Sequence, residues 1–189
     1  SARDISPTTG TTARNLCPVS RGCVEKPIDH DDIEPRLSNA QDSFRRCGQT
    51  PEEGLDVASA DLIQLTKACR LLSGAEKLCE DGYYTLTIEA AFTSIERTLL
   101  FWLITEGHHD PSRPPQSHTT AINRSADVGF ITEEVTTELE DLWKENRAHT
   151  YYQDGMATEE RANAMLALAG DIHTQIINLV GQSHECLCT

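Results

Sequence analysis

The sequence predicts an all-α protein, an up-and-down helical bundle of four to five main helices. Two observations lead to this fold class. Apolar residues recur at spacings of three and four through most of residues 31–181, which is the period of one helix face. No segment alternates apolar and polar residues with the β-branched enrichment that is typical of a strand. A length of 189 residues favours one well-buried domain over two.

Three parts are expected along the chain. Residues 1–30 combine prolines and glycines with runs of Ser and Thr and show no sustained periodicity, which predicts an irregular N-terminal extension. Residues 31–181 form the helical bundle, and residues 182–189 form a cysteine-bearing tail. The first helix of the bundle should be short and amphipathic. Its apolar stripe consists of Ile33, Leu37, Ala40, Phe44 and Cys47.

Two longer helices follow, and the second of them is predicted to be central. The stripe of the first begins with Leu62, Leu65, Cys69 and Leu72, and the helix should end near Gly82. The next helix is the most apolar element of the chain and should end near Gly107. Its buried face is expected to contain Ile88, Phe92, Ile95, Leu99 and Trp102.

Residues 107–129 form a connection that is longer than most loops within compact domains. It contains three prolines and three histidines, and a short helix is expected inside it over about residues 118–127. Another stripe then begins at Ile131 and continues to Leu142. The last helix should begin after Thr158, a good N-cap residue, and end at Gly181.

The charge balance limits the kinds of partner. The chain has 30 acidic against 16 basic residues and a net charge of -14, which opposes nonspecific attraction to nucleic acid or anionic membranes. An acidic, lysine-poor surface is also typical of a protein that works in concentrated salt, so a halophile is one interpretation. The alternative is an ordinary acidic domain. Without an apolar run of about 18 residues, no membrane segment is predicted, and we expect a cytoplasmic protein.

The segment WKENRAHTYY, from Trp143 to Tyr152, gathers polar side chains at the junction between two predicted helices. A cation beside an imidazole is suited to RNA cleavage or phosphate binding. The same groups can also cap and hold a helix bundle. The polar residues that we select as candidate site residues in this segment are Lys144, Asn146, Arg147, His149 and Tyr152.

Several segments resemble the HEPN family of helical nucleotide-binding domains. They are GYYTLTIEAAFTSIERTLLFWLITEG at 82–107, GFITEEVTTELEDLWKENRAHTYY at 129–152 and TEERANAMLALAGDIHTQIINLV at 158–180, and the resemblance covers about residues 55–180. It implies a four-helix bundle that forms a homodimer with paired active-site segments. Many members are metal-independent endoribonucleases of toxin–antitoxin or defence systems with a nucleotidyltransferase-type antitoxin partner. Others are non-catalytic RNA-binding or scaffold domains.

Catalytic members of that family carry an arginine followed after four to six residues by a histidine. At the corresponding place four residues separate Lys144 from His149, so the spacing fits but lysine replaces arginine. Arg147 lies two positions before His149. A literal fit at Arg113 and His118 lies in the proline-bearing connection, and we set it aside for that reason.

Metal-free RNA cleavage needs a base for the 2′-hydroxyl, an acid for the leaving oxygen and a cation for the phosphorane. His149 can serve as base or acid. Arg147 can hold the phosphate bidentately, with Lys144 as a supporting point charge. Asn146 and Tyr152 are expected to orient the substrate.

Glu96, on the predicted central helix, is expected to orient Arg147 or His149. The alternative is a structural polar cluster. In that case Arg147 pairs with Glu96 or Glu145, and His149 caps a helix end.

The cysteines have two interpretations. Cys17, Cys23, Cys186 and Cys188 lie near the two ends of the chain and can form a tetrahedral zinc site that ties both ends to the bundle. Alternatively, they are reduced thiols or disulfides that form on exposure to air. Cys69, on an apolar stripe, is expected to be a small core residue. His173 should be an interfacial or partly buried histidine.

The sequence thus leads to two functional hypotheses. In the first, the protein is a HEPN-type dimer that binds or cleaves RNA with His149, Arg147 and Lys144, and needs no cofactor. In the second, it is a non-catalytic interaction module that assembles with a protein partner, with structural zinc as an option.

Overall fold

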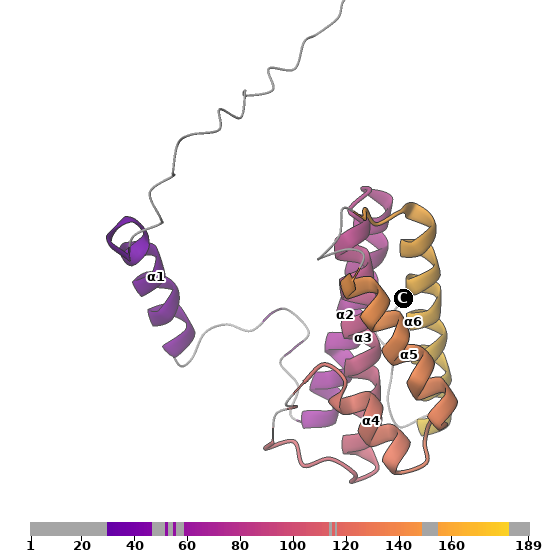
Figure 1. The fold of residues 1–189 in the computed structure, drawn as a ribbon. Helices are drawn as coiled ribbons and strands as arrows, with labels where there is room; N and C mark the ends of the chain where they lie inside the picture. The colour runs from indigo at the N-terminus through magenta and orange to yellow at the C-terminus, as the bar shows by residue number, and fades with distance from the viewer. Residues whose placement is uncertain are drawn as a thin grey trace, which may run out of the picture. The chain divides into compact units, whose positions relative to one another are not determined.

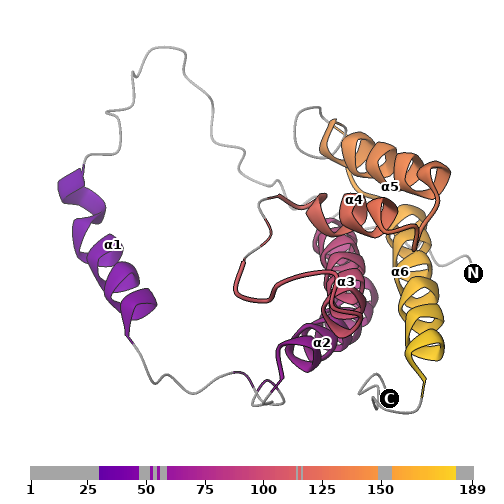
Figure 2. The same cartoon turned by 90° about the horizontal axis from the view of Figure 1, so that it is seen from below.

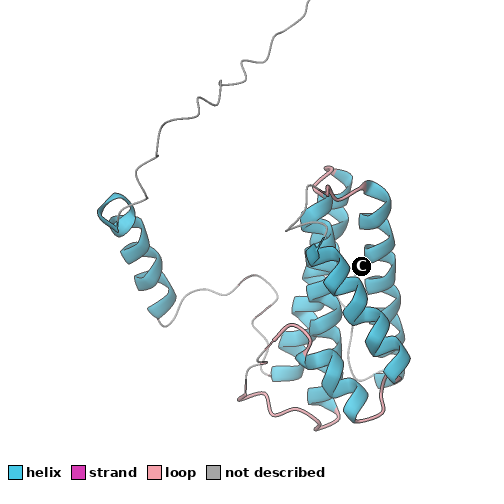
Figure 3. Cartoon of the chain, viewed as in Figure 1, coloured by secondary structure: helices cyan, strands magenta, loops and turns pink. Residues whose placement is uncertain are grey.

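The structure is a computed structural model that describes residues 30–46, 52, 55, 59–113, 115, 117–148 and 155–181, without the side chains of His30 and Asp32. The described residues form six helices and no strand, which confirms the predicted all-α class (Figure 3). The chain divides into two units, Ser1–Gln49 and Thr50–Thr189. The predicted bundle of residues 31–181 therefore includes parts of both units.

The described part of the first unit is one amphipathic helix, α1 (His30–Arg45), and the residue after it. The helix lies where the first apolar stripe predicts it. Ile33 is 44% exposed, Leu37 is 41% exposed and Phe44 is 93% exposed. These three apolar side chains of α1 are thus exposed.

The second unit is a bundle built around one central helix. Its elements are α2 (Ala60–Glu80), α3 (Tyr84–Thr105), α4 (Thr120–Asp127), α5 (Glu133–Asn146) and α6 (Glu159–Val180). The helix α3 packs against α2, α6 and α4, and the directions of α2, α3, α5 and α6 alternate up and down (Figures 1 and 2). None of the helices in the described ranges has the length and apolar character that crossing a membrane requires.

The core confirms the central position of α3. The large side chains of α3 that are at most 2% exposed are Ile95, Leu99, Phe101 and Leu103. Leu139 of α5 is also buried, whereas Val135 and Leu142 on the same helix are about two-fifths exposed. The predicted stripe of α5 is therefore only partly covered by the bundle.

Glycines at the helix ends set the turns of the bundle. Gly82, at a φ of +80°, donates its N–H to the carbonyl of Cys79, and Tyr83 donates to Leu78. This is a Schellman motif, which needs a residue with positive φ, and glycine adopts that conformation without steric cost. Only residues 81–83 separate α2 from α3, so the two helices must run antiparallel. Gly107 ends α3 in the same way and directs the chain into the connection toward α4.

The N-cap of α6 provides a test of the local sequence signals. The Thr158 hydroxyl oxygen accepts the backbone N–H of Arg161 at 3.3 Å, as the sequence predicts for this residue. Replacing Thr158 with alanine should lower the free energy of unfolding by about 1 kcal/mol, because a backbone donor loses its partner. Urea denaturation measures this change. Thr174→Ala, at an exposed position inside α6, is the matched control and should cost nothing measurable.

Candidate functional site

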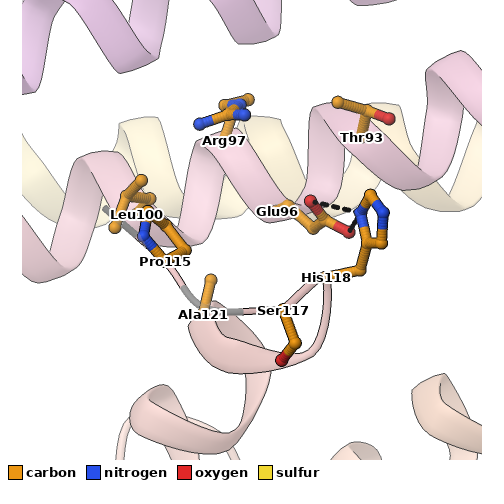
Figure 4. A pocket seen from close by; sticks show the side chains of 8 residues that line it. All are labelled: Thr93, Glu96, Arg97, Leu100, Pro115, Ser117, His118 and Ala121. Carbon is orange, nitrogen blue, oxygen red and sulfur yellow. Dashed lines mark hydrogen bonds and ion pairs between the residues drawn. The ribbon is translucent and has the colours of Figure 1, made fainter.

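A surface pocket of about 450 Å³ lies between α3 and the segment that leads into α4 (Figure 4). Residues of α3 form one wall, and residues around the start of α4 form the other. The lining residues are Thr93, Glu96, Arg97, Leu100, Pro115, Ser117, His118 and Ala121. The pocket thus combines an acid, a guanidinium and an imidazole, which is an arrangement that can transfer protons and hold an anion.

Glu96 and His118 form the central contact of this pocket. His118 Nδ1 lies 3.1 Å from Glu96 Oε1 (Figure 4). An ionised carboxylate only accepts hydrogen bonds, so the ring proton must sit on Nδ1 when Glu96 is ionised and His118 is neutral. The Nε2 atom then carries the free lone pair of the ring. In that state His118 has the tautomer that a general base requires.

The two partners differ in burial, and the difference affects the acid. The Glu96 side chain is 14% exposed and that of His118 is 58% exposed. Burial raises the pKa of Glu96 above its ordinary value, and the charge and hydrogen bond of His118 partly offset this effect. The pair thus joins a desolvated carboxyl group to an accessible imidazole.

The raised pKa of Glu96 leads to a prediction on stability. A carboxyl group whose pKa is higher in the folded state binds its proton more tightly there, so its contribution is largest at low pH. The contribution is lost as the pH rises from the ordinary value of 4.5 through the folded value. The free energy of unfolding of the wild type, relative to Glu96→Gln, should therefore be higher at pH 4 than at pH 7. Urea titrations of both proteins measure this difference, and an opposite slope would contradict it.

The loop that carries His118 is held in place by several contacts. His109 is 8% exposed, and its Nε2 lies 2.9 Å from the carbonyl oxygen of Arg113, to which it donates. The His108 ring packs against Trp102 at 5.5 Å between centroids, and Arg124 donates to the His108 carbonyl at 2.8 Å. These contacts hold the first part of the connection, from His108 to Arg113.

The predicted junction segment begins beside the same pocket. The Trp143 ring lies 5.1 Å from the His118 ring and 5.1 Å from the Phe92 ring, between centroids. The Arg147 guanidinium carbon lies 4.6 Å from the Trp143 centroid, a cation–π contact. Trp143 thus links the pocket histidine to the arginine that the sequence selected.

The other predicted residues of the junction have different surroundings. Lys144 is exposed and binds two carboxylates of its own helix, Asp141 at 3.2 Å and Glu140 at 3.6 Å. The hydrogen bond to Asp141 is the main reason that the pKa of Lys144 is raised. Asn146 donates its Nδ2 to Glu89 Oε1 at 2.8 Å. Both side chains thus have intramolecular partners.

Some predicted residues lie outside the described part of the chain. These are His149 and Tyr152 of the junction and the proposed zinc ligands Cys17, Cys23, Cys186 and Cys188. The predictions for them therefore stay predictions. Among the described residues, no group of three or more His, Cys, Asp or Glu side chains is placed to hold a metal ion.

The pocket is lined by His118, a residue that the sequence analysis set aside. His118 belongs to the literal arginine–histidine spacing at Arg113 and His118, and that spacing was the available signal. The Arg113 side chain is 85% exposed and pairs with Asp110 at 3.6 Å, and it is not one of the described residues that line the pocket. Arg97 lines the pocket in its place, and its Nη1 donates to Gln64 Oε1 at 3.1 Å.

The fold and the site define a class of protein, namely an all-α bundle with a carboxylate–imidazole pair in a surface pocket. The chain belongs to the DUF8154 family, a domain of unknown function, and the family model matches residues 28–188. Comparisons with curated proteins and with solved structures give no match. The family match carries no HEPN assignment.

Proposed function

We propose that this protein is a HEPN-type helical domain that acts on RNA as a metal-independent endoribonuclease. The observation that carries the proposal is the hydrogen-bonded pair of Glu96 and His118 in a surface pocket, beside the tryptophan that opens the junction segment. In this proposed function the protein is a homodimer, has a nucleotidyltransferase-type antitoxin partner and is cytoplasmic.

The chemistry assigns one task to each group. His118 Nε2 takes the proton of an RNA 2′-hydroxyl, and Glu96 stabilises the imidazolium that results. The 2′ oxygen attacks the adjacent phosphorus, and the bond from phosphorus to the 5′ oxygen breaks. Arg97, which lines the pocket, and Arg147, which packs on Trp143, are the proposed cations for the charge of the phosphorane. His149 is the proposed acid for the leaving oxygen.

The test is an RNA cleavage assay with a matched substrate. Purified protein in EDTA should cleave single-stranded RNA into products that end in a 2′,3′-cyclic phosphate and a 5′-hydroxyl. The same oligonucleotide with a single 2′-deoxy position should resist cleavage at that position only, because the nucleophile is missing there. Mass spectrometry of the products identifies both ends. Cleavage that persists at the deoxy position would rule out this mechanism.

A second candidate is a non-catalytic interaction module. It is favoured by the intramolecular partners of Lys144 and Asn146, since residues that bind a substrate phosphate would be expected to face solvent without such partners. In this case the protein binds its partner without cleaving RNA, and zinc on Cys17, Cys23, Cys186 and Cys188 ties its termini. RNA that stays intact at every salt concentration, together with one zinc per chain by metal analysis, would favour the module.

A further inference from the structure

We propose that Cys69 is a reactive thiol that forms mixed disulfides with small anionic disulfides, and that His173 takes its proton. This modification site is separate from the RNA pocket. Cys69 lies on α2 and His173 on α6, and both are at most 3% exposed. The burial of His173 exceeds what its sequence position predicted.

Three side chains form a relay across the bundle. Cys69 Sγ lies 3.6 Å from His173 Nε2, and His173 Nδ1 lies 3.0 Å from the hydroxyl oxygen of Thr98. The Thr98 hydroxyl donates its proton to the Ser94 carbonyl at 2.9 Å, so its oxygen must accept the proton on Nδ1. The lone pair of Nε2 then points to the thiol. Cys69, His173 and Thr98 thus have the order of nucleophile, base and orienting group.

A pocket of about 420 Å³ lies beside Cys69 on α2. Cys69 is one of its lining residues, and the charged side chains among the described lining residues are Arg70, Lys77 and Glu52. Arg70 Nη2 lies 3.3 Å from Glu52 Oε1, and Lys77 adds a second positive charge to the described lining. The hydroxyl groups of Thr66 and Ser73 add hydrogen-bonding partners. A disulfide that carries carboxylates fits this lining better than a neutral one.

The reaction is a thiol–disulfide exchange. The S–H proton of Cys69 moves to His173 Nε2, and the thiolate sulfur attacks one sulfur of the incoming disulfide. A new S–S bond joins Cys69 to that half of the reagent, and the old S–S bond breaks to release the other half as a thiolate. One S–S bond forms for each one that breaks, so the small disulfide is the only co-reactant that the step needs.

The experiment compares an anionic and a neutral disulfide reagent on the full chain. The anionic reagent is dithiobis(nitrobenzoate), and the neutral one is dithiodipyridine. Peptide-resolved mass spectrometry reports the rate at each cysteine, with Cys79 as the internal reference, because it lies on the same helix and bonds to Asn163. Each rate is divided by the rate of the same cysteine in the urea-unfolded chain. The normalised rate of Cys69 with the anionic reagent should then exceed that with the neutral reagent by about threefold or more. The rate should rise in proportion to reagent concentration.

Two variants decide between the relay and a merely buried thiol. His173→Gln should slow the reaction of Cys69 about tenfold or more and leave Cys79 unchanged, because the base is lost. Lys77→Ala, at an exposed position, should remove most of the preference for the anionic reagent. If His173→Gln does not fold, as judged by circular dichroism, the loss of charge preference in Lys77→Ala alone decides in favour, and an unchanged preference decides against.

Three results would overturn the proposal. The first is a reaction rate of Cys69 in the native protein that does not depend on reagent concentration. Such a rate would mean that the thiol reacts only when the whole protein unfolds. The second is a folded His173→Gln variant with an unchanged rate at Cys69. The third is an anionic preference at Cys69 that is no greater than that at Cys79.

Discussion

Replacing His118 with alanine should reduce kcat/KM for RNA cleavage by about 10²- to 10⁴-fold, the usual contribution of a general base. The fold should be retained, because the His118 side chain is 58% exposed. Cleavage kinetics under single-turnover conditions measure the loss, and circular dichroism checks the fold. The kcat/KM of Glu96→Gln should lie between those of the wild type and of His118→Ala, since the glutamine keeps the shape of the acid but not its charge.

The matched control for this prediction is Arg113→Ala. Arg113 completes the literal sequence motif with His118, but its side chain is exposed and pairs with Asp110. We therefore expect its loss to leave cleavage within about twofold of the wild type, as for an exposed ion pair. If His118→Ala cleaves normally, the proton-transfer role belongs to His149 or to no residue of this pocket. If Arg113→Ala is the inactive variant, the sequence motif is functional as it stands.

Replacing Phe101 with alanine should have the largest effect on stability, about 3–5 kcal/mol of the free energy of unfolding. Phe101 is fully buried on α3, where α2 and α6 pack, so its removal leaves a cavity that the surrounding helices cannot close. A small domain is stable by only about 5–15 kcal/mol, so the variant should unfold near physiological temperature or fail to accumulate. The urea midpoint measures the change.

Phe44→Ala provides the control with the same chemical substitution. Phe44 on α1 is 93% exposed, so its loss should change the unfolding free energy by less than about 0.5 kcal/mol. Phe101→Leu should lie between the two, because leucine fills part of the space. A Phe101→Ala protein with an unchanged midpoint would contradict the central position of α3 in the core.

The helices could be predicted from the sequence because each depends on local signals. The apolar period of α3, the N-cap at Thr158 and the glycines after α2 and α3 act within a few residues, and the structure has each of them in its expected role. The pairing of Lys144 with Glu140 and Asp141 was also readable, since the spacings of three and four bring these side chains together on one helix face.

The pocket could not be predicted in the same way because it depends on the path of a connection. Glu96 was expected to orient Arg147 or His149, and the structure has it hydrogen-bonded to His118, 22 positions away. That contact requires the chain to return to α3 after its prolines, and earlier in the same connection His109 donates to the Arg113 carbonyl. No periodicity encodes such a contact. The place of His118 in the pocket therefore follows from the path of the chain and not from its spacing to Arg113.

The three-residue connection between α2 and α3 has a consequence for how the bundle forms. Among the described helices, these two share the most extensive interface, and it closes over a very short stretch of chain. Forming it costs little loop entropy, so the α2–α3 hairpin should be largely formed in the folding transition state. Substitutions inside this hairpin should slow folding, whereas those on α6 should mainly accelerate unfolding. During synthesis, the hairpin would thus be complete before the ribosome has made the helix that covers it.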